Sequence, residues 1–246
     1  SDVWVGEEIS PYLQTGIGIR YPYLPVDKLI ENSKSGLKSW REVDIEERAG
    51  ILAEALERLT ERFFEMAYAT MHTTGQGFIM AFQASGAHSC DRALEAIAMG
   101  FSEIKRLPEQ IKWDKWVGSN AIPVRKTWKP VPRGISLVIG CSTFPVWNSM
   151  PGIFGSLITG NSVIVKPHPK AVLPIAIVVA ELRQLFKEAG LKPDTIQLAV
   201  DTTAEPITKQ LAEHADVKMI DFTGSSKFGN YIEGLPKITF TEKSAI

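Results

Sequence analysis

The sequence predicts an α/β fold: a Rossmann-like, doubly wound parallel sheet preceded by N-terminal helices and a bridging β-hairpin. Three observations support this. In the second half of the 246-residue chain, short segments rich in Val and Ile alternate with helical patterns, as βαβ units do. In the first half, apolar side chains recur every three or four residues. Between the halves, aromatic and polar residues alternate with the two-residue period of strands.

The first half divides into an arm, a helical part and a strand pair. Residues up to 23 are rich in Gly, Pro and Tyr, which indicates an extended arm. Residues 26–69 and 80–105 have the helical pattern, with a turn expected at 73–77. The alternation in 108–132, with prolines at its ends, predicts strands that bridge to another domain or subunit. We therefore expect four parts: an arm (1–25), a helical part of the cofactor domain (26–107), bridging or oligomerisation strands (108–132) and a Rossmann-like region (133–246).

In the second half the expected elements follow one another without a long interruption. The segment Ser162-Val163-Ile164-Val165-Lys166 is interpreted as a strand, and Gly190 suits the left-handed position that closes a helix. The expected order is a strand at 134–140, a short helix at 151–159, a strand at 162–166, a helix at 173–189, a strand at 195–200, a helix at 202–214, a strand at 217–222, a turn at 223–225, a further short helix and a strand at 237–241. This alternation predicts a parallel sheet.

The composition excludes several classes of function. With 44% apolar and 22% charged residues the chain is globular, and a net charge of −1 gives no field that favours nucleic acid or an anionic membrane. The longest apolar runs, 135–139 and 175–180, are far shorter than the roughly 20 residues that span a bilayer. Two cysteines, Cys90 and Cys141, form no disulfide framework, so we expect a cytoplasmic protein. No spacing of His, Cys, Asp and Glu predicts a metal site.

Ligands of such sheets bind beyond the carboxyl ends of the strands, where three segments are expected: 141–148, 166–170 and 223–229. Gly224 and Gly229 are expected to open a helix after a strand, where backbone N–H groups favour an anion. The alternative is a tight turn, because the full GxGxxG pattern is absent. Lys166 ends a strand and can donate to ribose hydroxyls or a phosphate, the alternative being a solvated lysine. We expect His168, between two prolines, to be a loop residue.

Together, three motifs resemble the aldehyde dehydrogenase superfamily in its order and spacing. They are 134–148, 160–167 (Gly-Asn-Ser-Val-Ile-Val-Lys-Pro) and 221–229 (Asp-Phe-Thr-Gly-Ser-Ser-Lys-Phe-Gly). The helical stretch with Trp40, Arg48 and Leu52 is similar to the family's N-terminal helices, so the resemblance covers roughly residues 36 to 242. It implies binding of NADP or NAD, a small-molecule aldehyde substrate oxidised to an acid, and a homo-oligomer.

The resemblance also implies roles for single residues. Lys166 contacts the adenosine ribose, and Gly224 and Ser225 lie against the pyrophosphate. Glu242 acts as general base on water or the thioester, the alternative being a solvated strand-end residue. Thr143 stands where the family has its oxyanion-hole asparagine, and its hydroxyl can still donate. The remaining expected cofactor contacts are Phe144 and Pro145 near the nicotinamide, and Pro169, Thr223 and Gly229.

Two departures from the family pattern refine these expectations. Pro169 stands where an acidic residue often binds the ribose 2′-hydroxyl, and nearby Lys170 carries a positive charge, so NADP is favoured over NAD. The run Glu242-Lys243-Ser244-Ala245, with His168-Pro169 and Ala81-Phe82-Gln83, resembles the phenylacetic acid degradation protein (PaaN-type) branch. The Ser-Thr pair at 142–143 occurs in aldehyde dehydrogenases linked to CoA. A CoA-linked semialdehyde from aromatic or phenylacetate degradation is the substrate class expected.

The family's nucleophilic cysteine lies some tens of residues beyond the position of Glu242, whereas the sequence ends at Ile246. We expect a fragment without the catalytic domain. Cys90, in an expected helix, is interpreted as a buried structural thiol, and Cys141 has no histidine to act as its base. Two alternatives stay open: a stand-alone, non-catalytic dinucleotide-binding or assembly module, and a structural remnant that binds no cofactor.

Overall fold

A five-stranded parallel sheet forms the centre of the computed structural model, which describes residues 2–244. The strand order is β11-β10-β7-β8-β9, and every neighbouring pair is parallel. Every residue of β7 and β8 is buried, as expected for strands covered on both faces. The strands are β7 (Ile135–Ile139), β8 (Ser162–Lys166), β9 (Ile196–Leu198), β10 (Val217–Ser225) and β11 (Ile238–Ser244). The predicted α/β fold is confirmed.

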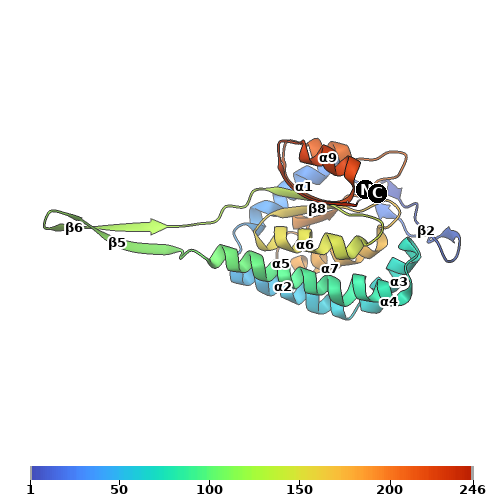
Figure 1. The fold of residues 1–246 in the computed structure, drawn as a ribbon, viewed down its shortest axis with the longest axis horizontal. Coiled ribbons are helices and arrows are strands. Elements are labelled where there is room, and N and C mark those ends of the chain that lie inside the picture. Colours follow the sequence, from blue (N-terminus) through green and yellow to red (C-terminus); the bar gives the residue numbers. More distant parts are fainter. Residues whose placement is uncertain (1, 245–246) are drawn as a thin grey trace.

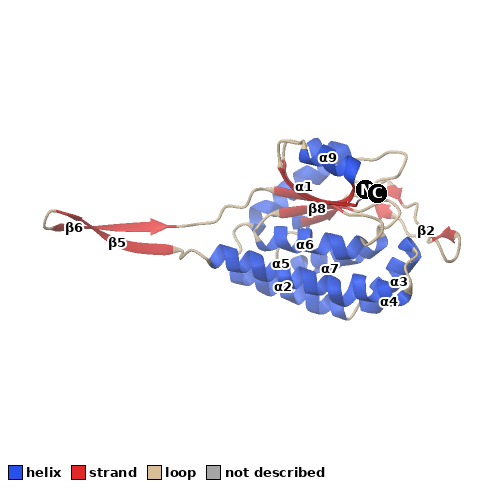
Figure 2. Cartoon of the chain, in the orientation of Figure 1, coloured by secondary structure: helices blue, strands red, loops and turns tan. Residues whose placement is uncertain are grey.

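Helices cover both faces of this sheet (Figure 2). On one face lie α6 (Pro145–Ile158) and α7 (Leu173–Glu188), and on the other lie α1 (Val26–Trp40), α8 (Thr208–Glu213) and α9 (Ser226–Glu233). The chain runs from β7 outward to β8 and β9, and then returns past β7 to β10 and β11. The strand order therefore reverses between β7 and β10, and this switch point is where a doubly wound sheet forms its ligand crevice.

A second helical layer covers α6 and α7 (Figure 1). It consists of α2 (Ile45–Thr60), α3 (Phe63–Thr74), α4 (Phe78–Phe82), the π-helical turn η1 (Gln83–Ala87) and α5 (His88–Lys105). Trp40 and Arg48 tie this layer to the sheet. The Trp40 indole donates to the Leu157 carbonyl at 2.8 Å, and the Arg48 guanidinium donates to the Ile158 carbonyl at 2.8 Å. Both carbonyls belong to the C-terminal turn of α6, where helical backbone partners run out, and the Leu157 carbonyl also accepts from the Gly160 N–H at 2.9 Å.

The N-terminal arm, residues 2–23, is more structured than the expected extended segment. It forms two small antiparallel ladders, β1 (Trp4–Val5) with β4 (Tyr21–Pro22) and β2 (Ile9–Ser10) with β3 (Thr15–Gly16). Gly6 allows this folding back, because a Cβ there would lie 2.2 Å from the Ile19 carbonyl oxygen. A period of two over so short a span gives no readable sequence signal.

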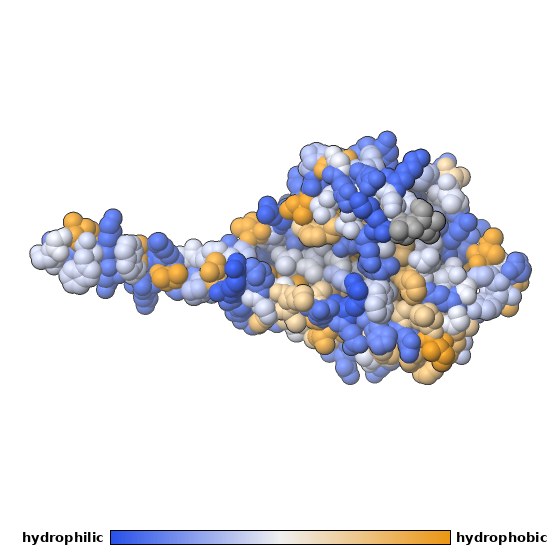
Figure 3. All heavy atoms as spheres, viewed as in Figure 1, coloured by the Kyte–Doolittle hydropathy of each residue, from blue (hydrophilic) through white to orange (hydrophobic). Residues whose placement is uncertain are grey.

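The strands β5 (Gln110–Val117) and β6 (Asn120–Thr127) form an antiparallel hairpin that projects far from the rest of the molecule (Figure 1). Gly118 in its turn has φ +61°, a backbone conformation that favours glycine. The hairpin exposes large apolar side chains between charged ones (Figure 3), with Trp113 52% and Trp116 69% exposed. The strand pair expected in 108–132 is confirmed.

Three expected elements have other bounds in the structure. Helix α6 begins at Pro145 rather than at residue 151: Pro145 occupies the first turn, where its missing N–H costs nothing, and Pro151 is tolerated inside the helix. Helix α8 begins at Thr208 rather than at 202. The turn expected at 223–225 is wrong, because β10 continues to Ser225 by pairing with β11. Smaller shifts occur at β9 and β11.

No helix within residues 2–244 has the length and apolar character needed to cross a membrane.

Candidate functional site

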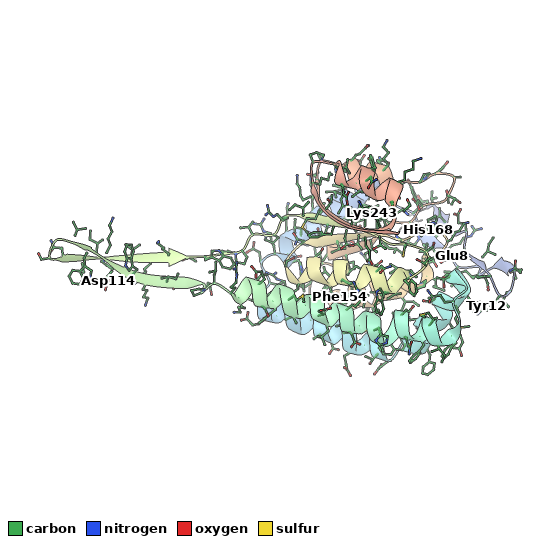
Figure 4. The ribbon with its side chains drawn as sticks, in the orientation of Figure 1. Glu8, Tyr12, Asp114, Phe154, His168 and Lys243 are labelled. Atoms are coloured by element: carbon green, nitrogen blue, oxygen red, sulfur yellow. The ribbon has the colours of Figure 1, made fainter. Side chains whose placement is uncertain are left out.

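The carboxyl ends of the five parallel strands meet at one edge of the sheet, and the predicted site segments lie there. Residues 141–148 follow β7, residues 166–170 begin at the last residue of β8, and residues 223–229 join β10 to α9. Glu242 lies near the end of β11. Figure 4 shows Lys243, His168 and Glu8 toward this end of the sheet, far from Asp114 in the hairpin.

The segment after β7 is held by side-chain contacts around Cys141. The Thr143 hydroxyl and the Asn148 amide both donate to the Cys141 sulfur, at 3.4 Å and 3.3 Å. The Gln76 amide, from the loop before α4, donates to the Thr143 carbonyl. Phe144 then caps α6, and Pro145 begins it. This network fixes Thr143 and Phe144 beside the first turn of α6 and at the switch point; the oxyanion role of Thr143 stays a prediction.

The segment between β10 and α9 begins a helix at Ser226, and Ser225 is its cap. The Phe228 N–H donates to the Ser225 hydroxyl at 3.4 Å. The two glycines do not open the helix, since Gly224 belongs to β10 and Gly229 lies inside α9. Both instead allow close packing, because a Cβ on Gly224 would lie 2.7 Å from the ring of Phe222.

A cavity of about 490 Å³ adjoins this cap. The side chains that line it are Lys209, Ser225, Lys227, Phe228 and Tyr231. Lys227 belongs to the first turn of α9, and a positive charge beside a helix N-terminus suits an anion such as a pyrophosphate. The Lys209 ammonium lies over the Tyr231 ring and 3.8 Å from the Glu213 carboxylate. The residues present at this end of the sheet therefore fit the phosphate part of a dinucleotide.

Lys166 is buried at the end of β8, and its interpretation as a solvated lysine is wrong. It is 2% exposed, and its ammonium lies 2.7 Å from the carboxylate of Asp201, which is 5% exposed. The ammonium also donates to the Pro167 carbonyl at 2.6 Å. Burial lowers the pKa of Lys166, and the Asp201 carboxylate opposes that shift. The expected contact of Lys166 with a ribose stays a prediction.

Asp201 was missed by sequence reasoning although a signal exists. It is the acidic residue that directly follows the strand expected at 195–200, and it lies three residues after the end of β9. Its second oxygen accepts from the Ile207 N–H at 3.0 Å, which fixes the loop before α8. An acidic side chain directly after a strand of a doubly wound sheet is a candidate ligand contact.

The loop after Lys166 carries little positive charge of its own. His168 is a loop residue as predicted, and its Nδ1 accepts from the Lys170 N–H at 3.2 Å. Burial lowers the pKa of His168, and the nearby ammonium groups of Lys166 and Lys170 lower it further. The imidazole is therefore neutral at pH 7. Pro169 is half-buried beside it, and Lys170 is exposed.

Two acidic residues of the N-terminal arm reach the same corner of the molecule. One Glu8 oxygen accepts from the N–H groups of Val172 and Leu173, at 2.6 Å and 2.9 Å, at the N-terminus of α7. The other accepts from the Tyr21 hydroxyl at 2.5 Å. Glu7 accepts from the N–H and the hydroxyl of Thr203, at 2.9 Å and 2.5 Å. Sequence reasoning gave neither glutamate a role, because nothing in the arm's pattern links it to residues so far away.

Glu242 shares its face of the sheet with a buried carboxyl group. It is paired in register with Thr223, while Asp221 is paired with Phe240, so Glu242 and Asp221 lie two positions apart on the same face. Burial raises the pKa of Asp221 to about 7; the charge of Glu242 adds to this effect and Arg92 opposes it. Gly152 of α6 leaves room for the Asp221 carboxyl, since a Cβ there would lie 2.7 Å from its Cγ.

The two cysteines differ in their surroundings. Cys90 is half-buried in α5, and burial raises its pKa to about 11, so it holds its proton at pH 7. This agrees with a structural thiol. Cys141 is half-buried at the carboxyl edge, where its contacts are the Thr143 hydroxyl and the Asn148 amide. Among residues 2–244, no group of three or more His, Cys, Asp and Glu side chains could hold a metal ion.

Comparisons with known proteins agree with this geometry. Residues 23–242 match the profile of the aldehyde dehydrogenase family. A benzaldehyde dehydrogenase (NAD+) of Pseudomonas putida is 27% identical over 208 residues, which are 84% of this chain and 39% of that protein. Malonate-semialdehyde dehydrogenase 2 of Geobacillus kaustophilus is 26% identical over 221 residues, covering 85% of this chain and 41% of that protein.

Solved structures of aldehyde dehydrogenases also resemble this chain. The crystal structure of an NAD-dependent aldehyde dehydrogenase from Burkholderia multivorans superimposes on all of this chain with a TM-score of 0.96 and 43% identity, over 45% of its own length. A glyceraldehyde-3-phosphate dehydrogenase of Methanocaldococcus jannaschii, solved with NADP, has a TM-score of 0.79 at 20% identity and shows the fold alone. The chain spans less than half the length of the Pseudomonas, Geobacillus and Burkholderia proteins.

Proposed function

Because the chain belongs to the aldehyde dehydrogenase family, we propose that it is the dinucleotide-binding portion of an NAD(P)-dependent enzyme that oxidises an aldehyde to an acid. One observation carries this proposal. Segments 141–148, 166–170 and 223–229, with Glu242, converge on the carboxyl edge of a doubly wound sheet. That edge, at the switch point between β7 and β10, is where such sheets bind dinucleotides.

Different residues of this edge would contact different parts of the dinucleotide. Ser225 and the backbone of Gly224 would lie against the pyrophosphate at the N-terminus of α9, with Thr223 and Gly229 shaping the same turn. Lys166, with Asp201, would lie at the ribose end, next to Pro169. Phe144 and Pro145 would lie near the nicotinamide end, at the start of α6. When bound, the nicotinamide accepts the hydride that leaves the aldehyde carbon.

The chemical roles proposed for this chain belong to Glu242 and Thr143. The Glu242 side chain is exposed and can take a proton from the water that releases the acid. The Thr143 hydroxyl can donate to the carbonyl oxygen as negative charge develops there. Cys141 is not proposed as the nucleophile, because its contacts are a hydroxyl and an amide, neither of which is a base. We propose that a cysteine outside this sequence attacks the aldehyde.

The finer assignments rest on the resemblance of short motifs. The sequence Glu242-Lys243-Ser244-Ala245 and the pair His168-Pro169 favour the phenylacetic acid degradation branch of the family, with a CoA-linked semialdehyde as substrate. Pro169, in place of an acidic residue, favours NADP over NAD. Carboxylates that the fold brings to the ends of β8 and β9 favour NAD over NADP.

Assembly is the role proposed for the hairpin. Residues 108–132 form a separate projecting unit whose exposed tryptophans, Trp113 and Trp116, suit burial against another subunit. We propose that this unit joins copies of the protein into a homo-oligomer, while residues 26–107 and 133–246 together hold the cofactor. A stand-alone binding module without catalysis is the second candidate, favoured by the contacts of Cys141, a hydroxyl and an amide, neither of which is a base.

The proposal is tested on the intact gene product, purified from its own cells. Its mass should exceed 27.2 kDa, the mass of this sequence, and it should reduce NAD or NADP only when an aldehyde is added. E242Q should slow acid release strongly, whereas E95Q, an exposed residue of α5, should change nothing. Binding of the dinucleotide without turnover by any aldehyde would favour the binding module; no binding at all would contradict both.

A further inference from the structure

The corner where β8 and β9 end is rich in carboxylates that come from distant parts of the chain. Asp201 follows β9, and Glu7 and Glu8 belong to the N-terminal arm. Glu7 accepts from the N–H and the hydroxyl of Thr203, two residues after Asp201, and Asp201 contacts Lys166 at the end of β8. Position 169 has no acidic side chain, but in the folded protein carboxylates from other segments lie at the same corner.

The positive charge at this corner is largely neutralised within the chain. The Lys166 ammonium is paired with Asp201 at 2.7 Å. His168 is neutral at pH 7, because burial and two ammonium groups lower its pKa. Lys170 is exposed, where water and salt screen its charge. The Asp201 charge is likewise offset by Lys166, so an added phosphate would find one screened lysine, Lys170, to offset Glu7.

The backbone anion site of the corner is also filled. The N-terminus of a helix is a natural site for a phosphate, because its first N–H groups have no partner within the helix. At α7 these are the N–H groups of Val172 and Leu173, and Glu8 accepts from both. The Tyr21 hydroxyl fixes the other Glu8 oxygen. A ligand phosphate would have to displace a buried carboxylate that makes three hydrogen bonds.

We infer that the N-terminal arm forms part of the dinucleotide site, and that Glu7 selects a free ribose 2′-hydroxyl over a 2′-phosphate. The inference rests on the proposed function, which places the adenosine ribose at Lys166. A hydroxyl can donate to the Glu7 carboxylate. A phosphate carrying about two negative charges is repelled by it, and like charges brought together in a partly buried site are costly. The protein therefore prefers NAD to NADP, contrary to the preference that Pro169 and Lys170 indicate.

Equilibrium binding of NAD and of NADP to the intact gene product, measured by calorimetry at low salt, tests this inference. The wild type should bind NAD more tightly. E7Q keeps an oxygen that can accept from Thr203 but removes the charge, so it should reduce the ratio of NAD to NADP affinity about fivefold. E7K, which reverses the charge, should reduce it further by raising the affinity for NADP. E205Q, an exposed glutamate in the loop before α8, is the matched control and should leave the ratio unchanged.

Each outcome decides the question. Unfolding curves of the variants that match the wild type show that the arm remains folded, so a changed ratio then reports charge. Equal or tighter binding of NADP by the wild type overturns the inference, as does a ratio that E7Q and E7K leave unaltered. If neither dinucleotide binds, the proposed function itself fails, and the inference fails with it; that result differs from loss of selectivity alone.

Discussion

The carboxylate of Asp201 lies 2.7 Å from the ammonium group of Lys166, and both side chains are almost completely buried. The pair connects the last residue of β8 to the loop after β9, at the edge where the dinucleotide is proposed to bind. Its position in the fold makes it both a structural contact and part of the proposed site. Substitutions can separate these two roles.

Removing one charge of this pair should destabilise the fold. D201N leaves the Lys166 ammonium buried without a counter-charge, so the free energy of unfolding should fall by about 3–5 kcal/mol. The double variant K166M/D201N should recover part of the loss. K34M removes one partner of the exposed Lys34–Asp216 pair and should cost less than about 1 kcal/mol. Urea unfolding measures all three. A D201N loss no larger than that of K34M would show that the buried pair contributes little.

Asp221 should make stability depend on pH. Its pKa in the folded protein is raised to about 7 from the ordinary value of 3.8, so the folded state holds this proton where the unfolded state has lost it. The contribution of Asp221 to the free energy of unfolding is most favourable below about pH 4, and it falls as the pH rises to about 7.

Removing the Asp221 charge should therefore stabilise the protein at neutral pH and above. D221N should have little effect at pH 4 and a gain of about 2–4 kcal/mol at pH 8. D114N, in the exposed hairpin, should show no such trend. Thermal or urea unfolding across this pH range measures the effect. A D221N curve parallel to the wild type would show that Asp221 is ionised throughout.

Two glycines of α6 should respond in opposite ways to the same substitution. G152A places a Cβ 2.7 Å from the Asp221 Cγ, so it should cost about 1–3 kcal/mol through overpacking. G155A meets only the Ala96 Cβ at 3.8 Å, an ordinary contact, and should stabilise by about 0.5–1 kcal/mol. The double variant G152A/D221A should recover most of the loss. Equal effects of G152A and G155A in urea unfolding would contradict the packing of Asp221 against α6.

The hairpin should matter for assembly and little for folding of the rest. Replacing residues 110–127 with a short Gly-Ser turn removes exposed strands whose partners are each other. Sedimentation velocity should show a smaller assembly, while circular dichroism retains the helical signal. W116K should weaken association in the same direction, with D114N as its control. An unchanged sedimentation coefficient after removal of the hairpin would exclude it as the assembly element.

Helices and strands that depend on neighbouring residues could be predicted from the sequence. Contacts between residues far apart in the sequence could not. The position of β8 follows from the apolar run Val163-Ile164-Val165, and the end of α7 follows from Gly190, whose φ is +71°. The convergence of three segments at one edge follows from strand–helix alternation. Helix α6 was expected to begin too late, because Pro151 was read as a helix start although a neighbouring proline, Pro145, already begins the helix.

The contacts that were missed join residues far apart in the sequence. Glu8 and Val172 are 164 positions apart, and Glu7 and Thr203 are 196 apart. No pattern in a short, irregular arm indicates such partners. The preference for NADP was inferred from Pro169 and Lys170, because carboxylates supplied by other segments are visible only after folding. Asp201 could have been singled out by its place directly after a strand.

The central claim, that the carboxyl edge of this sheet binds a dinucleotide, is tested most directly by hydrogen exchange of the intact gene product with and without NAD. The account predicts slower exchange of backbone amides in 141–148, 166–172 and 223–229, and unchanged exchange in the hairpin, residues 110–127. Protection confined to other segments, or no protection at saturating NAD and NADP, would contradict it.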